Sequence, residues 1–134
     1  METKLLEALK ESIEHWEKNA KLLSIDDVLL HADTKSSSCA LCNYIMPSVN
    51  GCGKCPVKQD TGLISCQGTP YDGAANARMS LSSAKRYWDV SKSEEDKAFF
   101  RREMDEAVRN WIYFANEEVE FLKSLLPVED HGEA

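Results

Sequence analysis

The chain has 134 residues, of which 43% are hydrophobic and 29% are charged, and these proportions suit one modest hydrophobic core. We therefore expect a single domain over residues 1–134. The formal net charge of −7 makes nucleic acid an unfavoured partner, because binding to phosphates needs a basic surface. No apolar run approaches the roughly 20 residues that cross a bilayer, and the glutamate-containing N-terminus does not match a secretory signal. The sequence thus predicts a cytoplasmic protein with no membrane partner.

Two helices are predicted within residues 1–31. Over residues 4–23, apolar side chains recur at alternating steps of three and four, which places them on one face of an amphipathic helix. A second, shorter helix should begin after Ser24, because Ser24 and Asp27 have the spacing of a capping box, and it should end near His31.

The helical periodicity stops in residues 39–73. This segment holds five of the six glycines and three of the four prolines, which indicates a loop. An unstructured loop of this length is uncommon inside a compact domain unless something other than apolar packing orders it. All five cysteines of the chain lie in the same segment.

Helices are expected again over residues 74–126. A third helix is marked by apolar residues at steps of four, three and four, namely Ala77, Leu81, Ala84 and Trp88. Ser93 and Asp96 form another capping-box-like start, and the fourth helix should run until Pro127 stops it. The tail, residues 127–134, is predicted to be flexible. The predicted fold class is therefore all-α: a small bundle of three to four helices, with a long cysteine-rich metal-binding loop inserted between helices.

Aromatic residues are frequent on the last two predicted helices. Helical spacing places most of this set in the core: Tyr87, Trp88, Phe99, Phe100, Trp111, Tyr113, Phe114 and Phe121. A surplus of aromatic residues on the last helix would also suit a surface that covers a second chain, so a homo-oligomer is compatible with the pattern.

The cysteines follow the spacing C-x2-C-x9-C-x2-C-x10-C, and they are Cys39, Cys42, Cys52, Cys55 and Cys66. In a reducing cytosol such spacing favours metal ligation over disulfides. Two C-x2-C pairs supply four thiolates, which is the tetrahedral ligand set that zinc prefers. Zinc binding on the order of 10–16 kcal/mol is enough to order a long loop. The sequence therefore predicts a structural zinc site.

Two questions about this metal site stay open at the level of sequence. Either the two C-x2-C pairs bind and Cys66 is spare, or Cys66 binds and displaces Cys39 or another member; the two pairs are preferred. An iron–sulfur cluster is the alternative cofactor, because Cys55-Pro56 resembles the end of a bacterial ferredoxin motif. The C-x2-C-x2-C-x3-C core of that motif is missing, so zinc is favoured.

Basic residues are enriched around the cysteines. Residues 35–92 hold seven basic and three acidic side chains, a local charge of +4 on an acidic chain. Hydroxyl groups and cations near the metal site could form a small anion or nucleotide pocket. The candidate ligand-binding residues are Lys54, Lys58, Thr69, Tyr71 and Arg78.

No catalytic motif is complete. A phosphate-binding P-loop and a nucleophile elbow are both missing from the sequence, and residues 39–73 contain no glutamate or histidine to act as a general base. The sequence therefore favours a non-enzymatic protein. An alternative is a metal-dependent enzyme acting on a nucleotide or nucleic acid, with Asp60, Thr69, Tyr71 or the spare thiol as working groups. A second alternative is a zinc-finger-type DNA-binding regulator, which the local basic charge supports.

The run CALCNYIMPSVNGCGKCPVKQDTGLISCQGTPYDGA, with the preceding SIEHWEKN helix, resembles small uncharacterised cysteine-rich proteins of tailed bacteriophages and prophages. The shared layout is CxxC…CxxCPV…TG…CxGTPY, and it covers about half of the chain. The resemblance transfers no activity. It implies a phage accessory protein in the cytoplasm of a bacterial host, where short proteins bind host enzymes or defence systems. The function expected is thus a zinc-stabilised, non-enzymatic protein that engages a host protein or a small anionic ligand, including in counter-defence.

Overall fold

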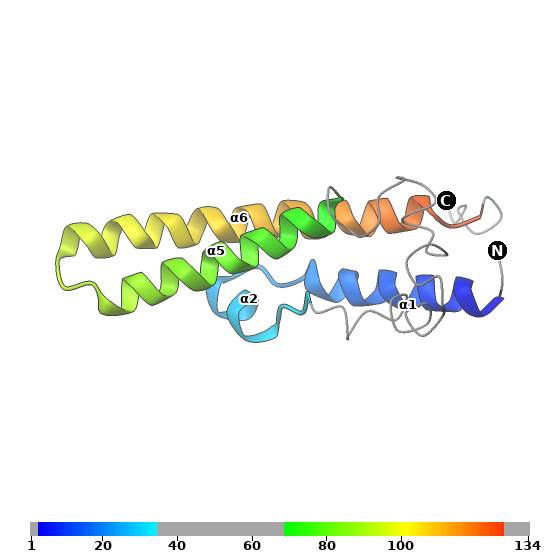
Figure 1. Cartoon of the computed structure of the whole chain (residues 1–134), viewed down its shortest axis with the longest axis horizontal. Helices are drawn as coiled ribbons and strands as arrows, with labels where there is room; N and C mark the ends of the chain where they lie inside the picture. Colours follow the sequence, from blue (N-terminus) through cyan, green and yellow to red (C-terminus); the bar gives the residue numbers. More distant parts are fainter. Residues whose placement is uncertain (1–2, 35–68, 128–134) are drawn as a thin grey trace, which may run out of the picture.

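The computed structural model describes residues 3–34 and 69–127, and the regular secondary structure of this part of the chain is all α-helix. Its elements are α1 (Thr3–Asn19), α2 (Ile25–His31), α5 (Pro70–Val90) and α6 (Glu94–Ser124). Helices α5 and α6 form a long antiparallel hairpin, α1 lies along the C-terminal part of α6, and α2 lies near the middle of the hairpin (Figure 1). The predicted all-α fold is confirmed. The five cysteines and the tail after Pro127 lie outside the described residues, and no described helix is long and apolar enough to cross a membrane.

Helix α1 ends four residues before the predicted end at residue 23. Its buried face follows the predicted stripe and consists of Ala8, Leu9, Ser12, Ile13, Trp16 and Asn19. After Asn19 the hydrogen bonds span three residues instead of four. The amide of Lys21 donates to the carbonyl of Lys18, and the amide of Leu22 donates to the carbonyl of Asn19. Such i to i+3 bonds are typical of the last turn of a helix. Leu23, predicted on the stripe, is therefore exposed.

Both predicted capping serines begin a helix. The hydroxyl of Ser24 accepts a hydrogen bond from the amide of Asp27 at 3.1 Å, and that of Ser93 accepts one from the amide of Asp96 at 3.0 Å. Helix α2 ends at His31 as predicted, and α6 ends at Ser124, two residues before the predicted end. The two helix starts depend on residues only three positions apart in sequence, so the spacing of these residues is enough to predict them.

Helix α5 begins earlier than predicted. The loop was expected to extend to residue 73, but α5 starts at Pro70 with Thr69 as its extended N-cap residue. Proline suits the first position of a helix because its missing N–H has no partner there and its φ angle is already helical. The glycines and proline that indicated a loop at this point thus mark a helix start.

The core is centred on Trp111 of α6, which is fully buried. Its ring lies 5.9 Å from that of Trp16 on α1, and the apolar face of α2 adds Val28. Helix α5 contributes mostly small side chains to this core: Ala74, Ala77, Leu81 and Ala84. Small residues let two helices approach closely, so α5 and α6 pack tightly along the hairpin.

The prediction that most aromatic residues of α5 and α6 are core residues was right for only half of the set, since Trp88, Phe114 and Phe121 pack against the core that contains Trp111. Trp111 is buried, but Tyr87, Phe99 and Tyr113 are 56%, 49% and 58% exposed, and the others are half-buried. The end of the hairpin near residues 87–99 extends past α1 (Figure 1). Helical spacing identifies which side chains share a face, but it does not show whether another element covers that face.

A glycine in α5 gives a test of the hairpin packing. A Cβ atom at Gly73 would lie 2.5 Å from a ring carbon of Phe114 on α6. Glycine to alanine inside a helix usually stabilises a protein by about 0.5–1 kcal/mol, whereas overpacking costs about 1–3 kcal/mol. We expect Gly73→Ala to lower the free energy of unfolding by about 1 kcal/mol, measured by urea denaturation followed by circular dichroism.

The matched control is the same substitution in a Phe114→Leu background, where the smaller side chain leaves room for the new methyl group. There, Gly73→Ala should be neutral or stabilising. An increase in stability from Gly73→Ala in the wild-type background would contradict the close packing of α5 on α6.

Candidate functional site

The two described chain ends that flank residues 35–68 are bonded to each other. The hydroxyl of Tyr71, in the first turn of α5, donates a hydrogen bond to the backbone carbonyl of Thr34. Thr34 is the last described residue before the cysteine-rich segment, and Thr69 is the first one after it. We use the name stem for this junction, formed by Asp33, Thr34, Thr69 and Tyr71.

Asn19, the last residue of α1, fixes the N-terminal side of the stem. Its side-chain oxygen accepts from the backbone N–H of Asp33 at 3.1 Å, and its side-chain nitrogen donates to the carbonyl of Asp33 at 3.0 Å. The Nε2 atom of His15 lies 2.8 Å from the same carbonyl, which can only accept, so Nε2 is the protonated nitrogen in this contact. Asn19 is only 3% exposed, so both bonds are shielded from water.

The stem is joined to the hydrophobic core by aromatic contacts. The ring of Tyr71 packs edge-on against Trp16 at 5.8 Å, and Trp16 in turn contacts Trp111. The indole N–H of Trp111 donates to the backbone carbonyl of Asn19 at 3.1 Å. Helices α1, α5 and α6 therefore all hold the stem, and its position depends on the packing of the core.

Holding the stem closed has an energetic consequence. Bringing together the ends of a loop as long as residues 35–68 costs about 3 kcal/mol of chain entropy, beyond a constant term. The hydrogen bond of Tyr71 to Thr34 joins those ends when the helices fold, and the bonds of Asn19 hold the N-terminal one in place. The folding of the helices therefore offsets the loop-closure entropy, which interactions within residues 35–68 would otherwise have to offset.

The described residues include three of the predicted ligand-binding residues. Thr69 and Tyr71 lie together in the stem, where Thr69 is buried and Tyr71 is half-buried. Arg78 lies two turns further along α5, where its guanidinium donates to the carbonyl of Leu29 on α2 and to the hydroxyl of Ser82. The structure thus places Arg78 in the packing of α2 on α5. Lys54 and Lys58 lie outside the described residues, so a pocket formed by all five stays a prediction.

The predicted metal ligands, Cys39, Cys42, Cys52, Cys55 and Cys66, likewise lie outside the described residues. Within residues 3–34 and 69–127, no group of three or more histidine, cysteine or acidic side chains is arranged to hold a metal ion. The zinc site therefore stays a prediction.

Three buried polar residues were missed by the sequence analysis, namely Ser12, Asn19 and Glu118. Asn19 lies three positions after Trp16, on the apolar stripe of α1, and Glu118 lies among the buried residues of α6. For Asn19 and Glu118 the available signal was a polar residue at an apolar position of a helix, because buried polar side chains usually have a hydrogen-bond partner. For Asn19 the partners are Asp33 and Trp111, which are distant in sequence.

Comparisons with known proteins give no relatives for this chain: no family model, curated protein or solved structure matches it. The resemblance to cysteine-rich phage proteins therefore stays a prediction. Function is argued below from the stem, the cysteine spacing and the charge pattern.

Replacement of Asn19 tests the stem directly. Asn19→Ala removes both side-chain bonds to Asp33 and leaves its backbone groups without those partners, so we expect the free energy of unfolding to fall by about 2–3 kcal/mol. Asn116→Ala is the matched control, because the side chain of Asn116 is exposed and, within residues 3–34 and 69–127, bonds only the carbonyl of Ile112 in its own helix. The control should change stability by no more than about 0.5 kcal/mol. Equal effects of the two substitutions in urea denaturation would contradict a structural role for the stem.

Proposed function

We propose that this chain is a non-enzymatic, zinc-stabilised binding protein. In this proposal the cysteine-rich segment, organised by zinc, presents the binding surface, and the helical body holds its two ends. The observation that supports it most is the stem: Tyr71, which follows residues 35–68, bonds Thr34, which precedes them, and Asn19 fixes the neighbouring Asp33. The helices hold the two ends of the cysteine-rich segment together, and this supports the proposal that zinc gives the segment a fixed structure.

The choice of zinc rests on the chemistry of the cysteines. Two C-x2-C pairs give four soft anionic ligands, and zinc has no preference that conflicts with a tetrahedral thiolate set. A zinc ion with four protein ligands has no open position for substrate, which makes the site structural. Zinc binding also requires the thiols to lose their protons, so folding of the segment and metal binding are coupled.

The partner we propose is a host bacterial protein or a small anionic ligand. Residues 35–92 have a local charge of +4 on a chain whose net charge is −7, so an acidic partner is attracted to this part of the chain and repelled by the rest. Lys54 and Lys58 are the cations closest to the cysteines in sequence. The resemblance to phage proteins supports the same type of role, a short accessory protein that binds a host component.

The hydrogen bonds of the stem also bear on the enzyme alternative. Of the working groups named for that alternative, which are Asp60, Thr69, Tyr71 and the spare thiol, the hydroxyl of Tyr71 donates to Thr34 and Thr69 is buried at the start of α5. A group engaged in holding the backbone is less suited to proton transfer with a substrate. These contacts support the binding role over metal-dependent catalysis.

Metal analysis tests the proposal. Protein purified without added metal should contain one zinc ion per chain by elemental analysis and native mass spectrometry, and it should be colourless. Replacing Cys42 or Cys52 by serine should remove the zinc, whereas Cys66→Ser should retain it if the two C-x2-C pairs are the ligands.

Three results would count against the proposal. Visible absorbance with bound iron would indicate an iron–sulfur cluster, and protein without any bound metal would exclude a zinc-organised segment. Zinc-dependent turnover of a nucleotide by the purified protein would instead favour the enzyme alternative.

A further inference from the structure

A groove separate from the stem lies between the start of α2, the C-terminal part of α5 and the middle of α6. Its volume is about 610 Å³, within the roughly 300–1,000 Å³ range of small-ligand pockets. Six apolar side chains line it: Leu23, Ile25, Trp88, Met104, Val108 and Ile112. Nothing in the proposed zinc-stabilised role uses this groove.

Helix α6 contributes half of the described lining residues of the groove. The lining residues of α6 run from Arg101 to Ile112 at alternating steps of three and one, a distance of about 16 Å along the helix axis. Met104 and Val108 are buried at the floor, whereas Leu23 on the opposite wall is 61% exposed. An apolar ligand lying along α6 would therefore cover Leu23 and contact Met104 and Val108.

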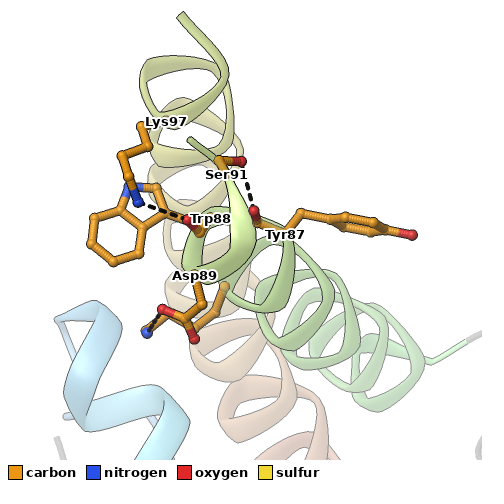
Figure 2. A network of polar contacts seen from close by, with 6 residues as sticks. Tyr87, Trp88, Asp89, Ser91 and Lys97 are labelled. Atoms are coloured by element: carbon orange, nitrogen blue, oxygen red, sulfur yellow. Dashed lines mark hydrogen bonds and ion pairs between the residues drawn. The ribbon is translucent and has the colours of Figure 1, made fainter. Parts of the chain in front are cut away.

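Trp88 forms the end of the groove at α5, and two lysines surround its ring. The ammonium group of Lys97 lies 4.3 Å from the ring centre and that of Lys85 lies 5.2 Å from it. Lys97 also donates to the backbone carbonyl of Trp88 at 3.0 Å, and Lys85 bonds Asp89 (Figure 2). In the same view Tyr87 points to the other side of α5 from Trp88, so the exposed Tyr87 side chain belongs to a different surface (Figure 2).

The charges that line the groove are Lys85, Arg101 and Arg109 against Asp26 and Asp105. Arg101 and Asp105 pair with each other along α6 at 3.4 Å, and Lys85 pairs with Asp89. Arg109 is exposed and makes no hydrogen bond or ion pair within residues 3–34 and 69–127. Among the described lining residues, Arg109 and Asp26 are the charges left outside these pairs, so on a chain with net charge −7 the groove offers one available arginine to an anionic group.

We infer that this groove binds an amphipathic anion, a molecule with an extended apolar chain and a carboxylate or similar head group. The apolar chain lies along α6 over Met104 and Val108, against Trp88 and Leu23. The head group lies at the groove edge, within reach of Arg109. Apolar contact supplies most of the affinity, and the cations select the anionic head group over a neutral or cationic one.

The probe for a direct test is 1-anilinonaphthalene-8-sulfonate, which has an aromatic body and an anionic group. Its fluorescence should increase in a saturable way with the purified full-length protein. Decanoate should displace it, and decyltrimethylammonium, which has the same chain length and the opposite charge, should displace it at least tenfold less well. No binding of either anion, or stronger displacement by the cationic compound, would overturn the inference.

Charge variants identify the groove as the site. Arg109→Glu should weaken decanoate binding roughly threefold or more, whereas Arg102→Glu, an equal charge change at an exposed residue of α6 outside the groove lining, should leave it unchanged. Asp26→Asn removes a carboxylate from the opposite wall and should strengthen binding. Equal effects of Arg109→Glu and Arg102→Glu would show that the site lies elsewhere.

A pair of leucine variants tests the apolar wall in the same assay. Leu23→Asp places a carboxylate in the groove and should weaken decanoate binding, whereas Leu30→Asp should not, because Leu30 is 75% exposed and does not line the groove. Both leucines are exposed, so neither variant should unfold the protein, and circular dichroism checks this. The zinc content of the same samples is measured in parallel, so failure of this inference and failure of the proposed function are separate results.

Discussion

The hydrogen bonds of Asn19 are the interaction on which the rest of the structure depends. Its side chain bonds both the backbone N–H and the backbone carbonyl of Asp33. Its own backbone carbonyl accepts a hydrogen bond from the indole N–H of Trp111. One residue thereby connects the end of α1, the centre of α6 and the chain that enters the cysteine-rich segment. Because the site is buried, each of these polar groups needs its partner, and the arrangement is correspondingly specific.

In this arrangement the helices and the cysteine-rich segment are stabilised by different interactions. The helices bury Trp16 and Trp111 and thereby bring Thr34 and Tyr71 together, which closes residues 35–68 at their base. In the function we propose, zinc then has to order only the interior of a segment whose ends are already joined. This division suits a binding protein, because the helical body stays constant while the closed segment carries the recognition.

The sequence predicted those features that depend on neighbouring residues. The helix starts at Ser24 and Ser93 were found because a serine and an acidic residue three positions later form a local signal. The start of α5 was placed too late because glycine and proline mark both loops and helix starts, and the role of Asn19 was missed because Trp111 and Asp33 contact it only in the folded chain. The exposure of Tyr87 and Phe99 was missed for a similar reason, since spacing does not reveal how far α1 extends along the hairpin.

The central claim is that closure of the stem and metal binding assist each other. The most direct test is the zinc dissociation constant of the wild-type protein, of Tyr71→Phe, which removes only the hydroxyl bonded to Thr34, and of the exposed control Asn116→Ala. If zinc binds chains in which the stem is closed, the apparent zinc affinity is proportional to the fraction of chains with a closed stem. Tyr71→Phe lowers that fraction, so this variant should bind zinc up to about tenfold more weakly. Asn116→Ala should match the wild type. Equal zinc affinity in all three folded proteins would contradict the account.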